Sequence, residues 1–140
     1  MAQCIQAWPE VNWVCPQLPE SPRAVASLLR DLSRGWEADQ MAVMGSSLGG
    51  YYATWLAEQV GCRAVLINPA VYPARDLRPW IGRHPAWHDP QSWIEVLPEH
   101  MEQMAELAVG PARRPEHYLT FIAQGDEVLD WREMAGRYPY

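Results

Sequence analysis

Short apolar runs alternate with segments of helical periodicity along much of the chain. Four β-rich or apolar runs predict strands, at residues 11–15, 41–44, 64–67 and 118–123. The first three are separated by stretches in which apolar residues recur every three or four positions, as on one face of a helix. Strands that alternate with helices over short links favour right-handed βαβ units. We therefore expect an α/β fold built on a parallel sheet.

The two helical segments in the first half carry start and stop signals. Ser21 followed by Pro22 predicts an N-cap with proline at the first helical position, and this helix should end near Gly35. A second helix is expected over residues 48–60 and is ended by Gly61. Both helices are long enough to cover a sheet face.

The second half is less regular. From about residue 69 to residue 98 the periodicity fails while Pro, Trp, His and Arg accumulate, so we expect a cap-like insertion over the surface rather than a sheet element. Residues 99–109 should form a helix, and Asp130 should cap a short last helix through Met134. Four residues of the 99–109 helix fall on one apolar face: Met101, Met104, Leu107 and Ala108.

Composition limits the class of protein. With 140 residues, 49% hydrophobic and 20% charged, the chain fits a single folded domain over residues 1–140. A net charge of -6 argues against nucleic-acid binding, which needs clustered Lys and Arg. No stretch approaches the roughly 20 apolar residues of a membrane span, and no signal peptide is evident, so we expect a cytoplasmic protein. Cys4, Cys15 and Cys62 are widely spaced and are expected to be reduced.

The sequence around Ser47 is the strongest candidate for chemistry. Gly45 and Gly49 flank it at the G-x-S-x-G spacing, between an expected strand and an expected helix, as in the nucleophile elbow of an α/β-hydrolase. Such a turn exposes the serine hydroxyl, aims the Leu48 N–H at a developing oxyanion, and needs small residues two positions either side. Two other structures fit the same glycines: a turn whose serine only caps the helix, and an anion-binding loop.

A serine nucleophile needs a histidine base, which in turn needs a carboxylate to orient it. Asp126 follows the expected strand at residues 118–123, where α/β-hydrolases carry their acid. Asp130 and Glu127 are the alternatives, and Gly125 also allows Asp126 simply to close a turn.

The histidine cannot be assigned in the expected order, because none follows Asp126. We expect all four histidines to be surface or packing residues, with a substitute base at His100 or His117 as the alternative. Prolines interrupt the one pair with metal-ligand spacing, so we expect no metal, and no motif predicts a cofactor. The four are His84, His88, His100 and His117.

Aromatic residues gather in two places. Tyr51, Tyr52 and Trp55 lie at helical spacing and are expected in the core. The insertion carries a second group, for which packing against the domain is favoured over an apolar acyl pocket above Ser47. That group comprises Trp80, Ile81, Trp87, Trp93 and Ile94.

Several segments together resemble the bacterial YqiA/YcfP-type esterases. The resemblance covers most of the chain in order and spacing, and it does not rest on G-x-S-x-G alone. It is carried by Pro16-Gln17-Leu18-Pro19, by the run from Gly45 to Leu56, by Asn68-Pro69-Ala70-Val71, and by the run from Gly125 to Asp130.

The resemblance implies a three-layer α/β-hydrolase fold that hydrolyses small carboxylic esters, preferably with short acyl chains, through an acyl-enzyme on Ser47. Members of that family open with a strand and a His-Gly-Phe-like loop and close with a strand and loop bearing the catalytic histidine. This chain matches neither part, so we expect an incomplete sheet with a central gap beside residues 41–44. The strands at residues 11–15 and 41–44 should either close up against each other or both expose hydrogen-bonding edges that favour association.

Two hypotheses about function follow. The first is an esterase lineage in which this chain alone has little or no activity, since one oxyanion donor and the base are missing. The second is a non-catalytic hydrolase-like module that binds a small acyl ligand or a protein, or a gene fragment. The sequence does not predict the natural substrate or the oligomeric state.

Overall fold

Three parallel strands form the centre of the protein in a computed structural model that describes residues 8–86 and 89–139. They are β1 (Ala42–Ser46), β2 (Arg63–Ile67) and β5 (Tyr118–Phe121), in the spatial order β1-β2-β5. In the register, Met44 lies opposite Val65, which lies opposite Leu119. The expected parallel α/β architecture is therefore confirmed.

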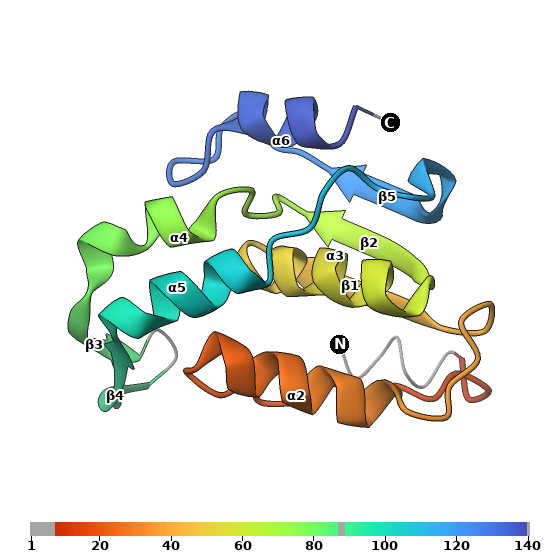
Figure 1. Ribbon diagram of the computed structural model, residues 1–140, viewed down its shortest axis with the longest axis horizontal. Coiled ribbons are helices and arrows are strands. Elements are labelled where there is room, and N and C mark those ends of the chain that lie inside the picture. Colours follow the sequence, from red (N-terminus) through yellow and green to blue (C-terminus); the bar gives the residue numbers. More distant parts are fainter. Residues whose placement is uncertain (1–7, 87–88, 140) are drawn as a thin grey trace.

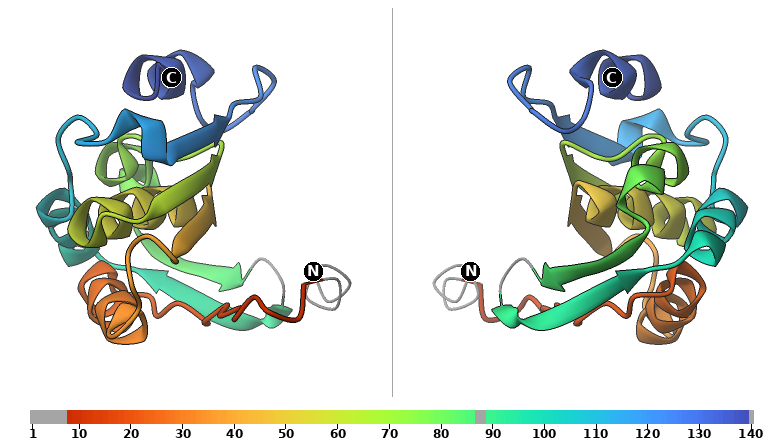
Figure 2. Two further views of the ribbon diagram at one scale, coloured as in Figure 1. Left: turned by 90° about the vertical axis from the view of Figure 1, so that its right-hand side faces the viewer. Right: turned by 90° about the vertical axis from the view of Figure 1, so that its left-hand side faces the viewer.

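Helices lie on one side of this sheet (Figures 1 and 2). The helix α3 (Leu48–Val60) packs directly on β1 and β2, and α2 (Pro22–Ser33) packs against α3 and α5 (Pro98–Glu106). The last helix, α6 (Trp131–Arg137), is tied to α3 by a hydrogen bond of 2.8 Å between the hydroxyls of Tyr138 and Thr54.

The predicted helix ends are confirmed where capping signals are strong. The Ser21 hydroxyl accepts a hydrogen bond from the Ala24 N–H at the start of α2. Gly61 adopts φ 84°, and its N–H donates to the Ala57 carbonyl at the end of α3. Asp130 caps α6, accepting from the Arg132 N–H.

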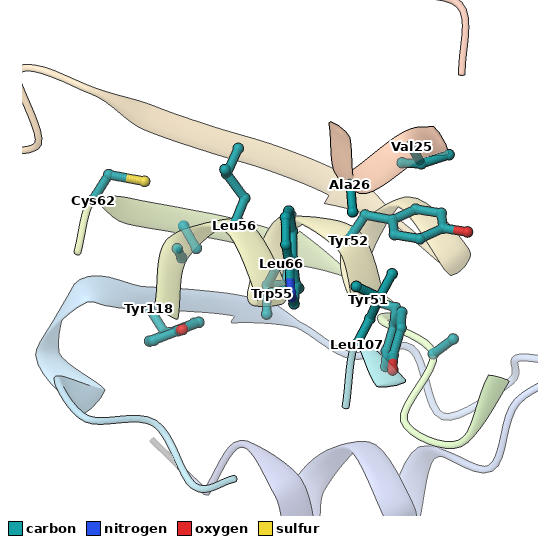
Figure 3. Packing of buried hydrophobic residues seen from close by; sticks show 14 of the residues in the cluster. Val25, Ala26, Tyr51, Tyr52, Trp55, Leu56, Cys62, Leu66, Leu107 and Tyr118 are labelled. Atoms are coloured by element: carbon teal, nitrogen blue, oxygen red, sulfur yellow. The ribbon is translucent and has the colours of Figure 1, made fainter. Parts of the chain in front are cut away.

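The core is built around α3 (Figure 3). Its residues from Gly50 to Ala57 are all buried, which confirms the expected packing of Tyr51, Tyr52 and Trp55. Leu66 of β2 is fully buried beneath this helix. Burying apolar side chains at about 25 cal/mol per Å² drives the association of helix and sheet.

The opposite sheet face is exposed. In β1 and β5 the outward apolar side chains Met44, Leu119 and Phe121 are 55–56% accessible, and Ile67 of β2 is 41% accessible. The described residues therefore form two layers, and the expected three-layer arrangement is wrong for them. Within the same residues, β1 pairs only with β2.

Residues 11–15 do not form the expected buried strand. Val11, Trp13 and Val14 are all exposed, with accessibilities of 42–51%. A strand is stabilised by a hydrogen-bonded neighbour, and this segment has none within the described chain. The expectation that it closes up against β1 is therefore wrong. The alternative, two strands with open edges, is met within the described residues only at β1.

The insertion holds more regular structure than its sequence indicates. It contains α4 (Pro73–Asp76), the 3₁₀ turn η1 (Arg78–Trp80), and an antiparallel pair formed by β3 (Gly82–Ala86) and β4 (Asp89–Val96). The prediction that this segment lacks a sheet element is wrong, although the pair is separate from the main sheet.

The other helix expectations need smaller corrections. The helix α5 ends at Glu106, before the expected end, and Ala108 is exposed rather than on its buried face.

Cys15 and Cys62 are free thiols, as expected, while Cys4 lies outside the described residues. Among residues 8–86 and 89–139, no helix has the length and apolar character to cross a membrane.

Candidate active site

Ser47 sits at a strained turn between β1 and α3. Its φ of 52° and ψ of -123° lie in a region that residues with a side chain rarely adopt. Backbone hydrogen bonds hold it there: its N–H donates to the Ile67 carbonyl at 3.0 Å, and its carbonyl accepts from the Ala70 N–H at 2.9 Å. The Ser47 side chain is exposed and makes no capping hydrogen bond, which argues against a purely capping role.

Of the two glycines predicted to be sterically required near Ser47, Gly45 and Gly49, the structure requires only Gly45. A Cβ on Gly45 would lie 2.1 Å from the Gly49 carbonyl oxygen, so Gly45 is required. A Cβ on Gly49 would meet nothing within 4 Å, so the expectation that Gly49 must be small for its own side chain is wrong. The second required position is Gly50, whose Cβ would lie 2.8 Å from the Pro69 Cβ.

The Leu48 N–H stays the predicted oxyanion donor, and its place in the helix is consistent with that prediction. Leu48 is the first residue of α3, and the first N–H groups of a helix have no partner within the helix. The partial positive charge at this end of a 13-residue helix favours an anion there. The same geometry suits an oxyanion or a bound anion, so it supports the site without choosing the ligand.

Asp126 lies in the loop after β5 and is held by three hydrogen bonds. Its Oδ1 accepts from the N–H groups of Val128 and Leu129 at 2.9 and 2.8 Å, and its Oδ2 accepts from the Asn68 side-chain amide at 2.9 Å. The bonds from Leu129 and Val128, followed by that from Asn68, lower the pKa of the carboxyl group. Asp126 therefore closes a turn and also presents a fixed carboxylate, whereas Asp130 is used as a helix cap.

Asn68 is a site residue that we did not single out from the sequence. It follows β2 with φ 42°, a left-handed conformation in which asparagine is enriched. Its backbone N–H donates to Phe121, and its side-chain oxygen accepts from the Ala123 N–H at 2.8 Å. A β-rich run followed by Asn-Pro was the available signal, because asparagine tolerates the turn that the strand exit needs.

Ser47 and Asp126 come from the same edge of the sheet. Each follows the carboxyl end of a strand, and β2 lies between those strands. Parallel strands about 4.8 Å apart place β1 and β5 about 10 Å from each other. Because the three strands are parallel, their carboxyl ends lie at one edge of the sheet.

The described histidines do not complete the site. His117 precedes β5, at the amino edge of the sheet and opposite the edge that carries Ser47. His100 is buried at the start of α5, where its Nδ1 accepts from the Leu97 N–H at 3.2 Å. His84 contacts the Trp80 carbonyl through Nε2. Within the described residues, no hydrogen bond joins these rings to Ser47, and His88 lies outside those residues.

Comparison with known proteins gives a family. The model of an uncharacterised protein family (UPF0227) matches residues 1–140. The chain belongs to this family. A UPF0227 protein of Yersinia enterocolitica is 23% identical over 137 residues, covering 94% of this chain and 69% of the relative. UPF0227 proteins of Yersinia pseudotuberculosis and Yersinia pestis are 22% identical over 136 residues, with the same coverage.

One cavity of this UPF0227 chain lies beside α3. It encloses about 540 Å³ between α3, the residues after β2, the segment before β5 and the end of α6. Neither Ser47 nor Asp126 lines it. A smaller cavity of about 200 Å³ lies at the other end of α3, beside His117 and Cys62.

The aromatic group of the insertion does not form the acyl pocket considered above. Trp80 and Trp93 are 55% and 53% exposed, and Ile81 and Ile94 are also exposed. None of the four lines either of these cavities, and none belongs to the buried core cluster, so the favoured packing of the insertion against the domain stays a prediction. Trp87 lies outside the described residues.

Proposed function

We propose that this chain carries the nucleophile and the acid of a serine esterase site in an α/β-hydrolase-type fold. The observation that carries the proposal is the backbone of Ser47, which is held at φ 52° and ψ -123° with its hydroxyl exposed. Strain of this kind costs about 1–3 kcal/mol and persists where the surrounding structure enforces it. A serine that served only as a helix cap would not need it.

The proposed reaction is hydrolysis of a small carboxylic ester, preferably with a short acyl group. The Ser47 Oγ attacks the ester carbonyl while a base takes its proton, and the oxyanion that forms is stabilised by the Leu48 N–H. Expulsion of the alcohol, which receives that proton, leaves an ester on Ser47. Water then attacks this acyl-enzyme and releases the carboxylic acid and the free hydroxyl.

Asp126 would orient the base in this scheme. Its fixed carboxylate accepts an N–H, which holds an imidazole in the tautomer that can take the Ser47 proton. Because no described histidine contacts Ser47, we propose that this chain alone turns over ester slowly or not at all.

Chemical rescue tests this proposal. Imidazole added to the full chain should supply the missing base and increase release of p-nitrophenol from p-nitrophenyl acetate above the rate with Ser47→Ala at the same imidazole concentration. The Ser47→Ala sample measures direct hydrolysis by imidazole, and Ser46→Ala is the matched control that should retain rescue. Mass spectrometry should find the trapped acetyl group on Ser47. Equal rates for the parent chain and Ser47→Ala, with no acetylated Ser47, would overturn the assignment.

A second candidate is a non-catalytic hydrolase-like module that binds a small acyl ligand. The cavity of about 540 Å³ favours it, because Tyr51, Ala70, Val71 and Val109 give the cavity an apolar lining. Saturable binding of a short-chain ester or acid that is lost on Val109→Asp, with no acylation of Ser47, would favour this candidate. Binding that persists in the variant would count against this cavity as the site.

A further inference from the structure

The turn that follows β2 contacts both ends of the candidate site. On one side, the Ile67 carbonyl accepts from the Ser47 N–H, and the Ala70 N–H donates to the Ser47 carbonyl. On the other side, Asn68 contacts the strand end and loop that carry Asp126. Three residues at the end of β2 and in the turn after it, Ile67, Asn68 and Ala70, therefore hold the backbone of the nucleophile and the side chain of the acid.

Three polar groups of Asn68 bond to β5 and to the loop that follows it. Its backbone N–H donates to the Phe121 carbonyl at 2.9 Å and extends the β2–β5 pairing beyond the strands. Its Oδ1 accepts from the Ala123 N–H at 2.8 Å, and its Nδ2 donates to the Asp126 Oδ2 at 2.9 Å. An amide side chain both accepts and donates in this way, whereas an ionised carboxylate of the same shape cannot donate.

The backbone of Asn68 favours the same residue type. At φ 42° most side chains are strained, while asparagine and glycine are tolerated. Replacement by alanine would combine backbone strain with loss of the side chain. Replacement by glycine separates these effects, since it removes the side chain and keeps the backbone conformation accessible.

From these contacts we infer that Asn68 is the positioning residue for Asp126: its side-chain amide fixes the Oδ2 atom at the edge of the sheet that carries Ser47. The inference deepens the proposed esterase site and rests on that proposal for its catalytic meaning. The hydrogen bond from Asn68 to Asp126 favours the charged form of the Asp126 carboxyl group whether or not the chain hydrolyses esters.

The ionisation of Asp126 reports this role directly. Its other hydrogen-bond donors are the backbone N–H groups of Val128 and Leu129, which no change at Asn68 removes. The loop also carries the carboxylates of Glu127 and Asp130, which are present in every variant. A change in the titration of Asp126 on mutation of Asn68 therefore reports the loss of this one donor.

The experiment is a carbon-13 NMR titration of the Asp126 carboxyl group in the full chain. Asn68→Asp keeps an acceptor for Ala123 but places a second carboxylate at Oδ2, and it should raise the apparent pKa of Asp126 by about one pH unit or more. Asn68→Gly should raise it by less, since only the donor is lost. Gln124→Glu is the matched control: it adds the same charge to the exposed loop and should leave the titration of Asp126 nearly unchanged.

The outcomes separate this inference from the proposed function. An unchanged Asp126 titration in both Asn68 variants would overturn the positioning role, whatever the esterase assay gives. If Asn68→Asp does not fold, Asn68→Gly alone decides. A raised pKa of Asp126 in the Asn68 variants, together with no imidazole-dependent acylation of Ser47 in the parent chain, would support the positioning role and refute the esterase assignment.

Discussion

Gly45→Ala tests the backbone crossing that forms the turn at Ser47. The new Cβ would lie 2.1 Å from the Gly49 carbonyl oxygen, 2.4 Å from its carbon and 2.7 Å from the Gly50 nitrogen. Real Cβ contacts are essentially never shorter than 3.0 Å, so the Gly49 oxygen would have to retreat by 0.9 Å, the difference between 3.0 and 2.1 Å. All three obstructing atoms are backbone, so no side-chain rotation relieves the contact.

The expected cost follows from that geometry. Overpacking typically destabilises a protein by 1–3 kcal/mol, and a backbone contact this short belongs at or above the upper end, about 3 kcal/mol. For a chain of this length, that loss corresponds to a Tm about 10 °C lower. Because the start of α3 must move, the Leu48 N–H also shifts, and any imidazole-supported acylation of Ser47 should fall.

Gly49→Ala is the matched control. Its Cβ would enter open space, and replacing glycine by alanine within a helix gains about 0.5–1 kcal/mol. Thermal unfolding followed by circular dichroism should therefore show Gly45→Ala strongly destabilised and Gly49→Ala unchanged or slightly stabilised. The reasoning is refuted if Gly45→Ala melts with the parent chain, or if the two variants lose equal stability.

Three further changes probe contacts elsewhere in the chain. Tyr138→Phe removes the buried bond to Thr54 and should cost about 1 kcal/mol in urea unfolding; no loss would show that this bond does not hold α6 to α3. Ser21→Ala removes the N-cap of α2 and should also cost about 1 kcal/mol, with recovery in Ser21→Asn. The hydrogen bonds that lower the pKa of Asp126 stabilise the folded chain when the pH is above the unfolded pKa near 3.8. This stabilisation is lost as the pH falls through the lower pKa of the folded chain, so the free energy of unfolding of Asp126→Asn should fall less steeply in acid than that of the parent chain. An equally steep fall in the variant would contradict this last expectation.

Local signals sufficed for the elements closest to the candidate site. Ser21, Gly61 and Asp130 mark helix ends that the structure confirms, because capping depends on groups within a few residues of each other. The elbow is likewise a local pattern, in which a strand, a glycine-flanked serine and a helix follow one another. Its strained conformation at Ser47 agrees with the prediction from spacing.

Other predictions failed because they depend on distant partners. Residues 11–15 have strand composition but pair with no strand among the residues that the structure describes, while β3 and β4 pair although prolines and polar residues hide their pattern. The prediction that Gly49 must lack a side chain is wrong. Gly50 must lack one instead, because Pro69 approaches α3 from another element.

The sequence by itself determined the order of strands and helices around Ser47, the helix ends, and the placement of Asp126 after a strand, since each depends on residues close together in the chain. Only the tertiary structure decided that Asn68 bonds to Asp126, that His117 lies at the far edge of the sheet, and that one sheet face is exposed. Those features depend on the pairing of strands separated by many residues. Pairing is set by the register and packing of the whole sheet, and not by any short segment.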